Sequence, residues 1–296
     1  MKHLFRAAAA FAAAALLFLL CACGSQAELS PQESAVQQLA EFFEARWSDS
    51  AVSLNSNDEW AAVDLCLLGR QPDSAAAQRF AAKYAAEGFP ASASTGDLVR
   101  AVLVMRALSL DEAELQAAAQ ELNDRAPDEN SIYTMPYVLA ALKCADNYEE
   151  SCLQLKDRIL AQQLESGGWN GFGARADADT TGPVLMALAC YAHEEPVALA
   201  CSRAAECMAE LYGEDGVVPS SGSSACSTAM LITGLSALGA DTELPLPGLL
   251  GLFSAETLFA VRPGDVMSNE QALRAFAACS HSGTCLYAPL FPGLEG

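Results

Sequence analysis

Residues 162–191, QQLESGGWNGFGARADADTTGPVLMALACY, join a glycine-rich turn to an apolar helix and decide how the chain is interpreted. From Thr181 to Tyr191 there is no charged residue, and a helix that is apolar on every side has to be buried. Asp177 and Asp179 stand at its start, where short polar side chains accept hydrogen bonds from the free backbone N–H groups. Two neighbouring carboxylates are also a candidate acid pair. Capping and catalysis therefore both remain open for Asp177 and Asp179.

Five further segments repeat this pattern of a polar start followed by a nearly uncharged helix. With Thr181, their starts at Asp58, Asp97, Thr134, Thr228 and Gln271 recur every 37 to 47 residues. Such periods are typical of helical hairpins. More amphipathic segments alternate with them, at 31–47, 73–88, 111–126, 149–167, 195–213 and 244–261. The sequence predicts an all-α (α/α)6 toroid with six inner and six outer helices, rather than an open solenoid, whose ends would need polar capping repeats.

The N-terminus has the composition of an export signal. Lys2 and Arg6 precede an apolar run and a segment of small residues that ends in Cys23. The stretch 20–23, LCAC, resembles the lipobox of bacterial lipoproteins, in which the cysteine carries the lipid. The expected organisation is a signal peptide at 1–22, lipidated Cys23 with a linker at 23–30, and one toroid domain at 31–296. The resemblance implies an exported bacterial protein anchored to the outer face of the membrane; a secretory signal cut near Ala22 or Ala27 is the alternative.

Charge and cysteine content limit the classes of partner. The chain has 37 acidic against 16 basic residues, so its surface repels nucleic acids, and a nucleic-acid partner is not expected. The eleven cysteines show no paired CxxC spacing, only three histidines are present, and no metal site is predicted. Two close pairs, Cys144 with Cys152 and Cys279 with Cys285, are candidate disulfides. On alanine- and leucine-rich helices, Cys66, Cys190 and Cys226 are expected to be small buried thiols instead.

The segment QQLESGGWNGF at 162–172 resembles the QW-type repeat of the terpene cyclase and protein prenyltransferase superfamily, whose members are squalene cyclase-like toroids. The segment that follows, ADADTTGPVLMALACYA, is similar to the inner helix that comes after this repeat in the family. A second copy at 212–239 has the same order of glycine-containing turn and apolar helix but has no tryptophan. The inner-helix start is also similar to that of cobalamin carriers of the intrinsic factor type. In this repeat Trp169 is expected to fill the turn between repeats as a packing residue.

The resemblance to class II terpene cyclases implies a role for the two aspartates. Their acid motif is DxDD followed by Thr, so Asp177 matches its first and Asp179 its middle, proton-donating aspartate, while Thr180 replaces the last. Two features argue against cyclisation. The family encloses its substrate between two α/α domains, whereas this chain offers one, and few aromatic residues are available to stabilise a carbocation.

In a closed ring the N-termini of the inner helices gather around the mouth of the central cavity. The residues expected there are Asp58, Trp60, Asp97, Tyr133, Thr134, Asp177, Asp179, Thr180, Ser227, Glu270 and Gln271. A polar rim above an apolar throat is typical of small-molecule sites. The main expectation is a non-catalytic module that binds a small molecule or a glycan, with no cofactor, and the resemblance to cobalamin carriers suggests a corrinoid as the ligand. The alternatives are an enzyme that uses Asp177 and Asp179 as acid and base, either a terpenoid cyclase or a glycoside hydrolase or lyase, and a scaffold for a surface protein partner.

Overall fold

The computed structural model describes residues 29–262 and 265–291. The chain divides into two units, 1–34 and 35–296, and the ring of helices, apart from residues 31–34, belongs to the second unit. The predicted signal peptide and the predicted lipid attachment at Cys23 lie outside the described residues. Among the helices that are described, none combines the length and the hydropathy needed to cross a bilayer.

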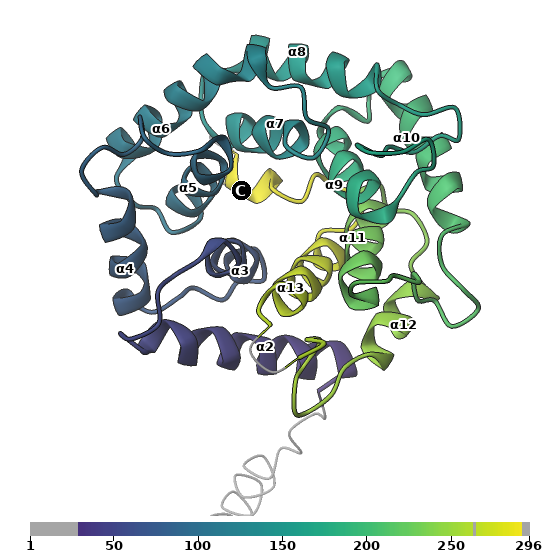
Figure 1. Ribbon diagram of the computed structural model, residues 1–296, viewed down its shortest axis with the longest axis horizontal. Coiled ribbons are helices and arrows are strands. Elements are labelled where there is room, and N and C mark those ends of the chain that lie inside the picture. Colours follow the sequence, from purple (N-terminus) through teal and green to yellow (C-terminus); the bar gives the residue numbers. More distant parts are fainter. Residues whose placement is uncertain (1–28, 263–264, 292–296) are drawn as a thin grey trace, which may run out of the picture. The chain divides into compact units, whose positions relative to one another are not determined.

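Two concentric sets of helices form the ring, as Figure 1 shows. The inner set is α3 (Ser56–Leu67), α5 (Thr95–Ala107), α7 (Met135–Cys144), α9 (Ala178–Leu188), α11 (Ser224–Ala237) and α13 (Met267–Ser280). The outer set is α2 (Pro31–Ser48), α4 (Ser74–Tyr84), α6 (Glu112–Arg125), α8 (Glu149–Leu160), α10 (Glu195–Ala209) and α12 (Pro245–Gly251). Three short 3-10 helices, Ala126–Asp128, Ala189–Tyr191 and Ala288–Leu290, complete the helical structure of the described residues. The predicted all-α toroid of six helical hairpins is confirmed.

The inner helices form a closed circle. Each contacts the next in chain order from α3 to α13, and α13 contacts α3. Closure buries these helices on all sides, which explains why α9 and α11 consist almost entirely of buried residues. An open solenoid would leave α3 and α13 apart, so that alternative is wrong.

Local capping explains where several inner helices begin. Asn55 and Asp58 form a capping box at the start of α3, and Ser94 and Asp97 form another at the start of α5. At α9 the backbone N–H of Thr180 donates to the Asp177 carboxylate at 2.7 Å. The predicted capping role of Asp177 is confirmed.

The inter-repeat turn is built around Trp169. Its side chain is fully buried, and its indole N–H donates to the carbonyl of Ile159 at 2.8 Å. The backbone N–H of Trp169 in turn donates to the Thr181 hydroxyl at 3.0 Å, which joins the turn to α9. The prediction that Trp169 is a packing residue is confirmed.

The C-terminal segment closes the ring at the C-terminal ends of the inner helices. His281 Nε2 lies 2.9 Å from the Leu67 carbonyl at the end of α3, and the Gly283 N–H donates to the Ser236 carbonyl of α11 at 2.8 Å. Tyr287 is fully buried, and Figure 1 shows the yellow chain end inside the ring near α5 and α7. The segment therefore forms the floor of the central space, although the sequence gives it only a loop-like pattern.

One outer helix is shorter than expected. The apolar segment 244–261 is helical only in α12, which ends at Gly251. Beyond it, Ser254 and Leu258 exchange both backbone hydrogen bonds, at 2.9 and 2.8 Å, and Leu258 has a positive φ of 56°. This tight turn replaces the helical bonds, so the expected continuation to Val261 is wrong.

The cysteine predictions are only partly correct. A disulfide joins Cys190, just after α9, to Cys285 in the C-terminal segment. Cys144, Cys152 and Cys279 have free thiols, so neither pair of sequence neighbours is bridged. The ring brings together two cysteines that are 95 residues apart, and short sequence spacing cannot reveal such a pair. The expectation of a free thiol at Cys190 is therefore wrong.

Helices α9 and α11 approach each other at two glycines. A Cβ atom on Gly182 would lie 2.0 Å from the carbonyl oxygen of Met230, and one on Gly234 would lie 2.8 Å from the Cα atom of Gly182. We expect Gly182→Ala to lower the free energy of unfolding by about 1–3 kcal/mol, because the backbones have to move apart. Chemical denaturation measures this, with Gly251→Ala as the matched control, since nothing lies within 4 Å of a Cβ atom there. Equal stability of the two variants would contradict this close helix contact.

Candidate functional site

Two adjoining cavities lie at the N-terminal ends of the inner helices. The Trp60 cavity, of about 260 Å³, is lined by Ser56, Asn57, Trp60, Gly96, Val99, Arg100, Tyr133, Thr134, Tyr137, Met267, Glu270, Gln271 and Arg274. The Asp179 cavity, of about 330 Å³, is lined by Tyr137, Asp179, Ser220, Gly222, Ser223, Cys226, Ser227, Met230, Met267 and Gln271. Tyr137, Met267 and Gln271 line both, so the two spaces adjoin along α7 and α13. All six inner helices contribute, as the closed ring predicts.

The structure brings most of the predicted rim together and leaves out four members. Trp60, Tyr133, Thr134, Glu270 and Gln271 line the Trp60 cavity. Asp179, Ser227 and Gln271 line the Asp179 cavity. The four residues outside both linings are Asp58, Asp97, Asp177 and Thr180.

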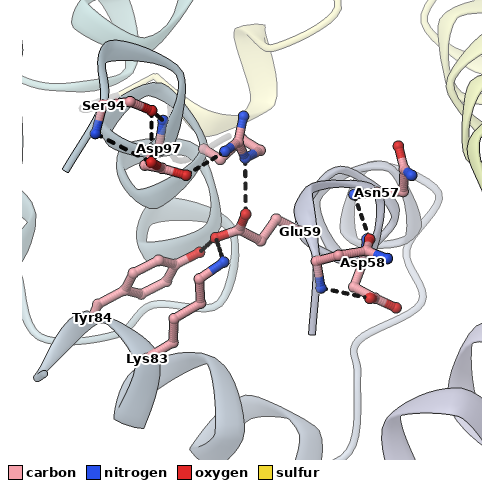
Figure 2. Close-up of polar contacts among 9 residues, drawn as sticks. Asn57, Asp58, Glu59, Lys83, Tyr84, Ser94 and Asp97 are labelled. Carbon is pink, nitrogen blue, oxygen red and sulfur yellow. Dashed lines mark hydrogen bonds and ion pairs between the residues drawn. The ribbon is translucent and has the colours of Figure 1, made fainter. Parts of the chain in front are cut away.

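Asp58 and Asp97 contribute to helix ends and ion pairs instead. Asp58 is fully buried and accepts hydrogen bonds from Arg46 at 2.7 Å and from the Trp47 indole at 3.2 Å, both on the outer helix α2. Asp97 accepts from Ser94 at 2.6 Å and from Arg100 at 2.5 Å. In Figure 2 the Asp58 carboxylate turns back toward the start of its own helix, and Asp97 lies beside Ser94. These contacts account for both residues without a ligand.

Glu59 forms a second polar centre between α3, α4 and α5. Its carboxylate accepts from Tyr84 at 2.7 Å and from Arg100 at 2.8 Å, and Lys83 lies 2.9 Å away (Figure 2). Arg100 is thus held by two carboxylates, those of Glu59 and Asp97, although it lines the Trp60 cavity. Its charge is neutralised before any ligand arrives.

Asp179 occupies the second position of α9 and faces the Asp179 cavity. The Ser227 hydroxyl of α11 donates to its Oδ2 atom at 3.1 Å. Asp179 keeps contact with solvent at the cavity mouth, yet the surrounding helix ends displace enough water to raise its pKa above the ordinary range. The charge of Asp177 adds to this rise, and the Ser227 hydrogen bond opposes it. Asp179 is therefore an acid that holds its proton more tightly than a free aspartic acid, beside an apolar space.

A buried charge cluster forms the inner wall of the Trp60 cavity. Arg274 pairs with Glu270 one turn earlier in α13, and its Nε atom lies 3.5 Å from Asp64 Oδ2 of α3. The guanidinium also stacks on Trp60, with 4.4 Å between its carbon and the ring centroid. Tyr137 lies next to Trp60, with ring centroids 5.2 Å apart. Two buried carboxyl groups thus share one buried cation.

Burial changes the ionisation of both carboxyl groups. It raises the pKa of Glu270 to about 8 and that of Asp64 to about 7, and the positive charge of Arg274 limits both shifts. The negative charge of Asp64 and a hydrogen bond between the two carboxyl groups raise the pKa of Glu270 further. Because one guanidinium balances one carboxylate, the cluster retains a proton at neutral pH, and Glu270 is the group that keeps it.

Sequence reasoning missed two members of this cluster, Asp64 and Arg274. A signal was present, because Asp64 and Arg274 are isolated charges inside otherwise apolar inner helices, and a buried charge requires a partner. Which helices would face each other across the ring was not deducible from the local pattern.

An aromatic pair joins the glycine-rich turn to the lining of the Trp60 cavity, to which Tyr133 belongs. Phe172, from the glycine-rich turn, is 92% exposed and stacks on Tyr133, with 5.1 Å between the ring centroids. A Cβ atom on Gly171 would lie 2.1 Å from the Tyr133 ring, so the close approach depends on that glycine. The turn therefore packs against a residue of the cavity lining as well as against its own repeat.

No group of three or more histidine, cysteine, aspartate or glutamate side chains suited to a metal ion occurs in the described parts of the chain. What the cavities do present is two protonatable carboxyl groups, a hydroxyl donor and aromatic walls. This set suits proton transfer to, or hydrogen bonding with, a largely apolar molecule.

Comparison with known proteins finds the same fold in solved enzymes. No family model and no curated protein matches the sequence. The type II terpene cyclase MstE from Scytonema is similar in structure: an aspartate-to-asparagine variant bound to its substrate, geranylgeranyl dihydroxybenzoate, gives a TM-score of 0.60 at 11% identity, over 84% of this chain and 97% of that chain. A tyrosine-to-phenylalanine variant without ligand gives 0.58 at 12% identity, and an aspartate-to-alanine variant bound to the product merosterolic acid A gives 0.57 at 13% identity. The alignments with these two variants each cover 88% of this chain and 98% of the solved MstE chain.

These similarities establish a terpene cyclase-like toroid and revise two expectations. One chain of this size spans nearly the whole of a solved type II terpene cyclase, so the argument that cyclisation needs a second α/α domain is wrong. Since the neighbours are enzymes, they also give no support to a non-catalytic binding module or to the inclination against enzymatic activity.

Proposed function

We propose that this chain is an acid-initiated, terpene cyclase-like enzyme, in which Asp179 protonates an alkene or epoxide of an isoprenoid held in the two cavities. The observation that carries the proposal is the position of Asp179. Asp179, an acid with a raised pKa, lies at the start of α9 and lines a cavity together with Met230, Met267 and Tyr137. The alkene or epoxide of the substrate would lie in this cavity. An acid that keeps its proton until such a substrate arrives is the requirement of this reaction.

The remaining steps need groups that the cavities supply. Addition of the proton to one alkene carbon leaves a cation on the other, a second double bond attacks it to form a carbon–carbon bond, and loss of a proton from the final cation ends the reaction. The ring faces of Tyr137 and Trp60 stabilise positive charge on the way, because aromatic faces attract cations. Asp179 regains its proton from solvent, with which it keeps contact.

Ionisation of a diphosphate is a poor fit to this site. A diphosphate requires cations that are free to neutralise it, and the basic side chains of the described cavity linings are Arg100 and Arg274. Arg100 is held by Glu59 and Asp97, and Arg274 by Glu270 and Asp64. Protonation of carbon therefore suits the site better than departure of an anionic group.

The proposal is tested by incubating the mature chain with geranylgeraniol, farnesol and their terminal epoxides in deuterated water. From the alkene probes we expect a cyclised product that has one deuterium on carbon, detected by mass spectrometry, because the proton comes from an acid that exchanges with solvent. From the epoxides, whose oxygen takes the proton, we expect a cyclised alcohol without deuterium on carbon. Tight binding with every probe recovered unchanged and free of deuterium would contradict the enzyme and favour the binding module that the sequence pattern first suggested.

A further inference from the structure

The proposed reaction ends when the final cation loses a proton, and a group in the cavities has to take that proton. Carboxyl groups are effective proton acceptors, and the described linings of the two cavities contain two of them, Asp179 and Glu270. Asp179 acts at the start of the reaction, and each ring closure moves the positive charge along the chain, away from the first protonated carbon. The carboxyl group left to receive the last proton is therefore Glu270, in the Trp60 cavity.

Glu270 is held on one side and open to the cavity on the other. Its Oε1 atom accepts a hydrogen bond from Arg274. Within the described residues, both oxygens of Asp64 are fully buried without a hydrogen-bond donor, whereas Oε2 of Glu270 does not belong to this class of buried atoms. The Glu270 side chain is 3% exposed and lines the Trp60 cavity, so a proton that leaves a ligand there can reach Oε2.

Asp64 lies behind Glu270 as seen from the ligand. It is fully buried, it lines neither cavity, and it forms a hydrogen bond with Glu270. Two carboxyl groups can form such a bond only if one of them is protonated. Since Glu270 keeps this proton at neutral pH, Asp64 is the ionised partner. The pair can therefore take up one more proton, although the ionised group has no contact with the cavity.

We infer that Glu270 is the catalytic base that ends the proposed reaction. As the C–H bond next to the final cation breaks, its electron pair forms the new double bond and its proton adds to Glu270, whose own proton passes to Asp64. Asp64 acts only through Glu270 and is a positioning residue. Both carboxyl groups are then neutral and Arg274 is left without a counter-charge, which favours return of the proton to water once the product leaves.

The other groups of this wall suit a cation that is about to lose a proton. Trp60 and Tyr137 line the same cavity, with ring centroids 5.2 Å apart, and aromatic faces attract cations. Before the transfer, the charges of Arg274 and Asp64 cancel each other. A cation in the cavity therefore meets a neutral wall with an acceptor and not a free guanidinium. The inference rests on the proposed function for the presence of this cation.

Two nearly isosteric variants separate the base from the cluster around it. Glu270→Gln and Asp64→Asn each remove one carboxyl group and leave the other to pair with Arg274, but the remaining carboxylate lines the cavity only in Asp64→Asn. With geranylgeraniol in deuterated water, we expect Glu270→Gln to lower the ratio of cyclised alkene to hydrated product about tenfold or more, because an amide cannot take the proton. In Asp64→Asn at pH 8 the alkene should remain the main product. Mass spectrometry measures the ratio, which does not depend on the amount of folded protein, and Glu150→Gln on the exposed face of α8 is the control.

The pH profile of this ratio tests the positioning role of Asp64. The parent needs one ionised group in the pair, so its alkene share should fall as the pH falls below about 7, the pKa of Asp64. In Asp64→Asn, Glu270 loses the negative charge and the hydrogen bond that raise its pKa, and the same fall should move to lower pH. The other groups that face Glu270 are Arg274 on its own helix, Tyr137 on α7 and Tyr287 in the C-terminal segment, and burial raises the pKa of both tyrosines. A merely structural role of Asp64 would not move the profile.

Binding of a cation mimic tests the acceptor without turnover. Protonated N,N-dimethyldodecylamine can donate its N–H, whereas dodecyltrimethylammonium has the same charge and no N–H. Their affinities are measured below the micelle concentration in Asp179→Asn, which lacks the other cavity carboxylate, by the fluorescence of the cavity residue Trp60. We expect the amine to bind about tenfold more tightly than the quaternary probe, because it forms a hydrogen bond with a charged group. This preference should disappear when Glu270→Gln is added and persist when Asp64→Asn is added.

The inference and the proposed function fail in different ways. A deuterated cyclic product with the same composition in Glu270→Gln and in the parent would overturn the base and leave the enzyme in place. An equal change in Glu270→Gln and Asp64→Asn would also overturn it, because disruption of the cluster would then explain both. Absence of any cyclised product would contradict the proposed function, and the two ammonium probes would then decide whether Glu270 accepts a proton from the cavity. Equal affinity for these probes would overturn the inference whatever the turnover.

Discussion

Replacing Arg274 with methionine is expected to lower the free energy of unfolding by about 3–5 kcal/mol at pH 8, because it leaves two buried carboxyl groups without their shared cation. Arg274 pairs with Glu270 and Asp64 and stacks on Trp60, and the Arg274, Glu270 and Asp64 side chains are nearly or fully removed from water. Chemical denaturation of the two proteins measures the difference. Lys143→Met is the matched control, since its partner Glu149 is largely exposed and such pairs contribute about 1 kcal/mol or less.

The pH dependence of the Arg274→Met deficit distinguishes a charge effect from lost packing. A carboxyl group with a raised pKa in the folded state binds more protons there than in the unfolded chain, whose carboxyl groups titrate near pH 4. Stability therefore falls as the pH rises from about 4 through the pKa values of about 7 and 8 for Asp64 and Glu270. Without Arg274 both pKa values rise further, so the deficit should grow over this range and narrow near pH 4. A deficit that is constant from pH 4 to pH 8 would show that packing alone is lost.

The fold was predictable because its evidence is local. A polar start followed by a largely apolar inner helix recurs six times, and four of these helices begin at a side-chain cap such as Asp177. The repeat length and the burial pattern then leave a closed ring as the simplest solution. The exceptions arise where contacts between distant segments override the local pattern: the end of α12 at Gly251 and the bond between Cys190 and Cys285.

The site was predictable only in its outline. Helix order places N-termini at one mouth, which located Trp60, Tyr133, Asp179 and Glu270 correctly. It could not separate residues that face the cavity from those that face the outer helices, because both lie in the first turns of inner helices. Asp58 is an example: it lies between the cavity-lining residues Asn57 and Trp60 in the chain, but its side chain bonds to Arg46 and Trp47 of α2.

The second large effect concerns Asp179. We expect Asp179→Asn to lower the rate of deuterium incorporation by about 100-fold or more, while the dissociation constant for farnesol changes little, because asparagine keeps the shape and removes the acid. Asp177→Asn is the matched control on the same helix end. Asparagine caps a helix as well as aspartate does, and Asp177 lines neither cavity, so stability should stay close to that of the parent. The rate should change far less than in Asp179→Asn, because the variant removes only a neighbouring charge that helps to raise the pKa of Asp179. Turnover and thermal unfolding of the three proteins check this directly.

The Ser227→Ala variant connects the rate to the pKa of Asp179. The Ser227 hydroxyl stabilises the ionised carboxylate, and its removal should raise the pKa, which burial already places above the ordinary range. Since the proton donor must be in its acid form, the rate declines as the pH rises through that pKa, and in Ser227→Ala this decline should move to higher pH. A decline that stays in place in Ser227→Ala, but disappears in Glu270→Gln, would mean that the proton comes from the Trp60 cavity. In that case the two carboxyl groups would exchange roles, with Glu270 as the acid that starts the reaction and Asp179 as a residue of the mouth.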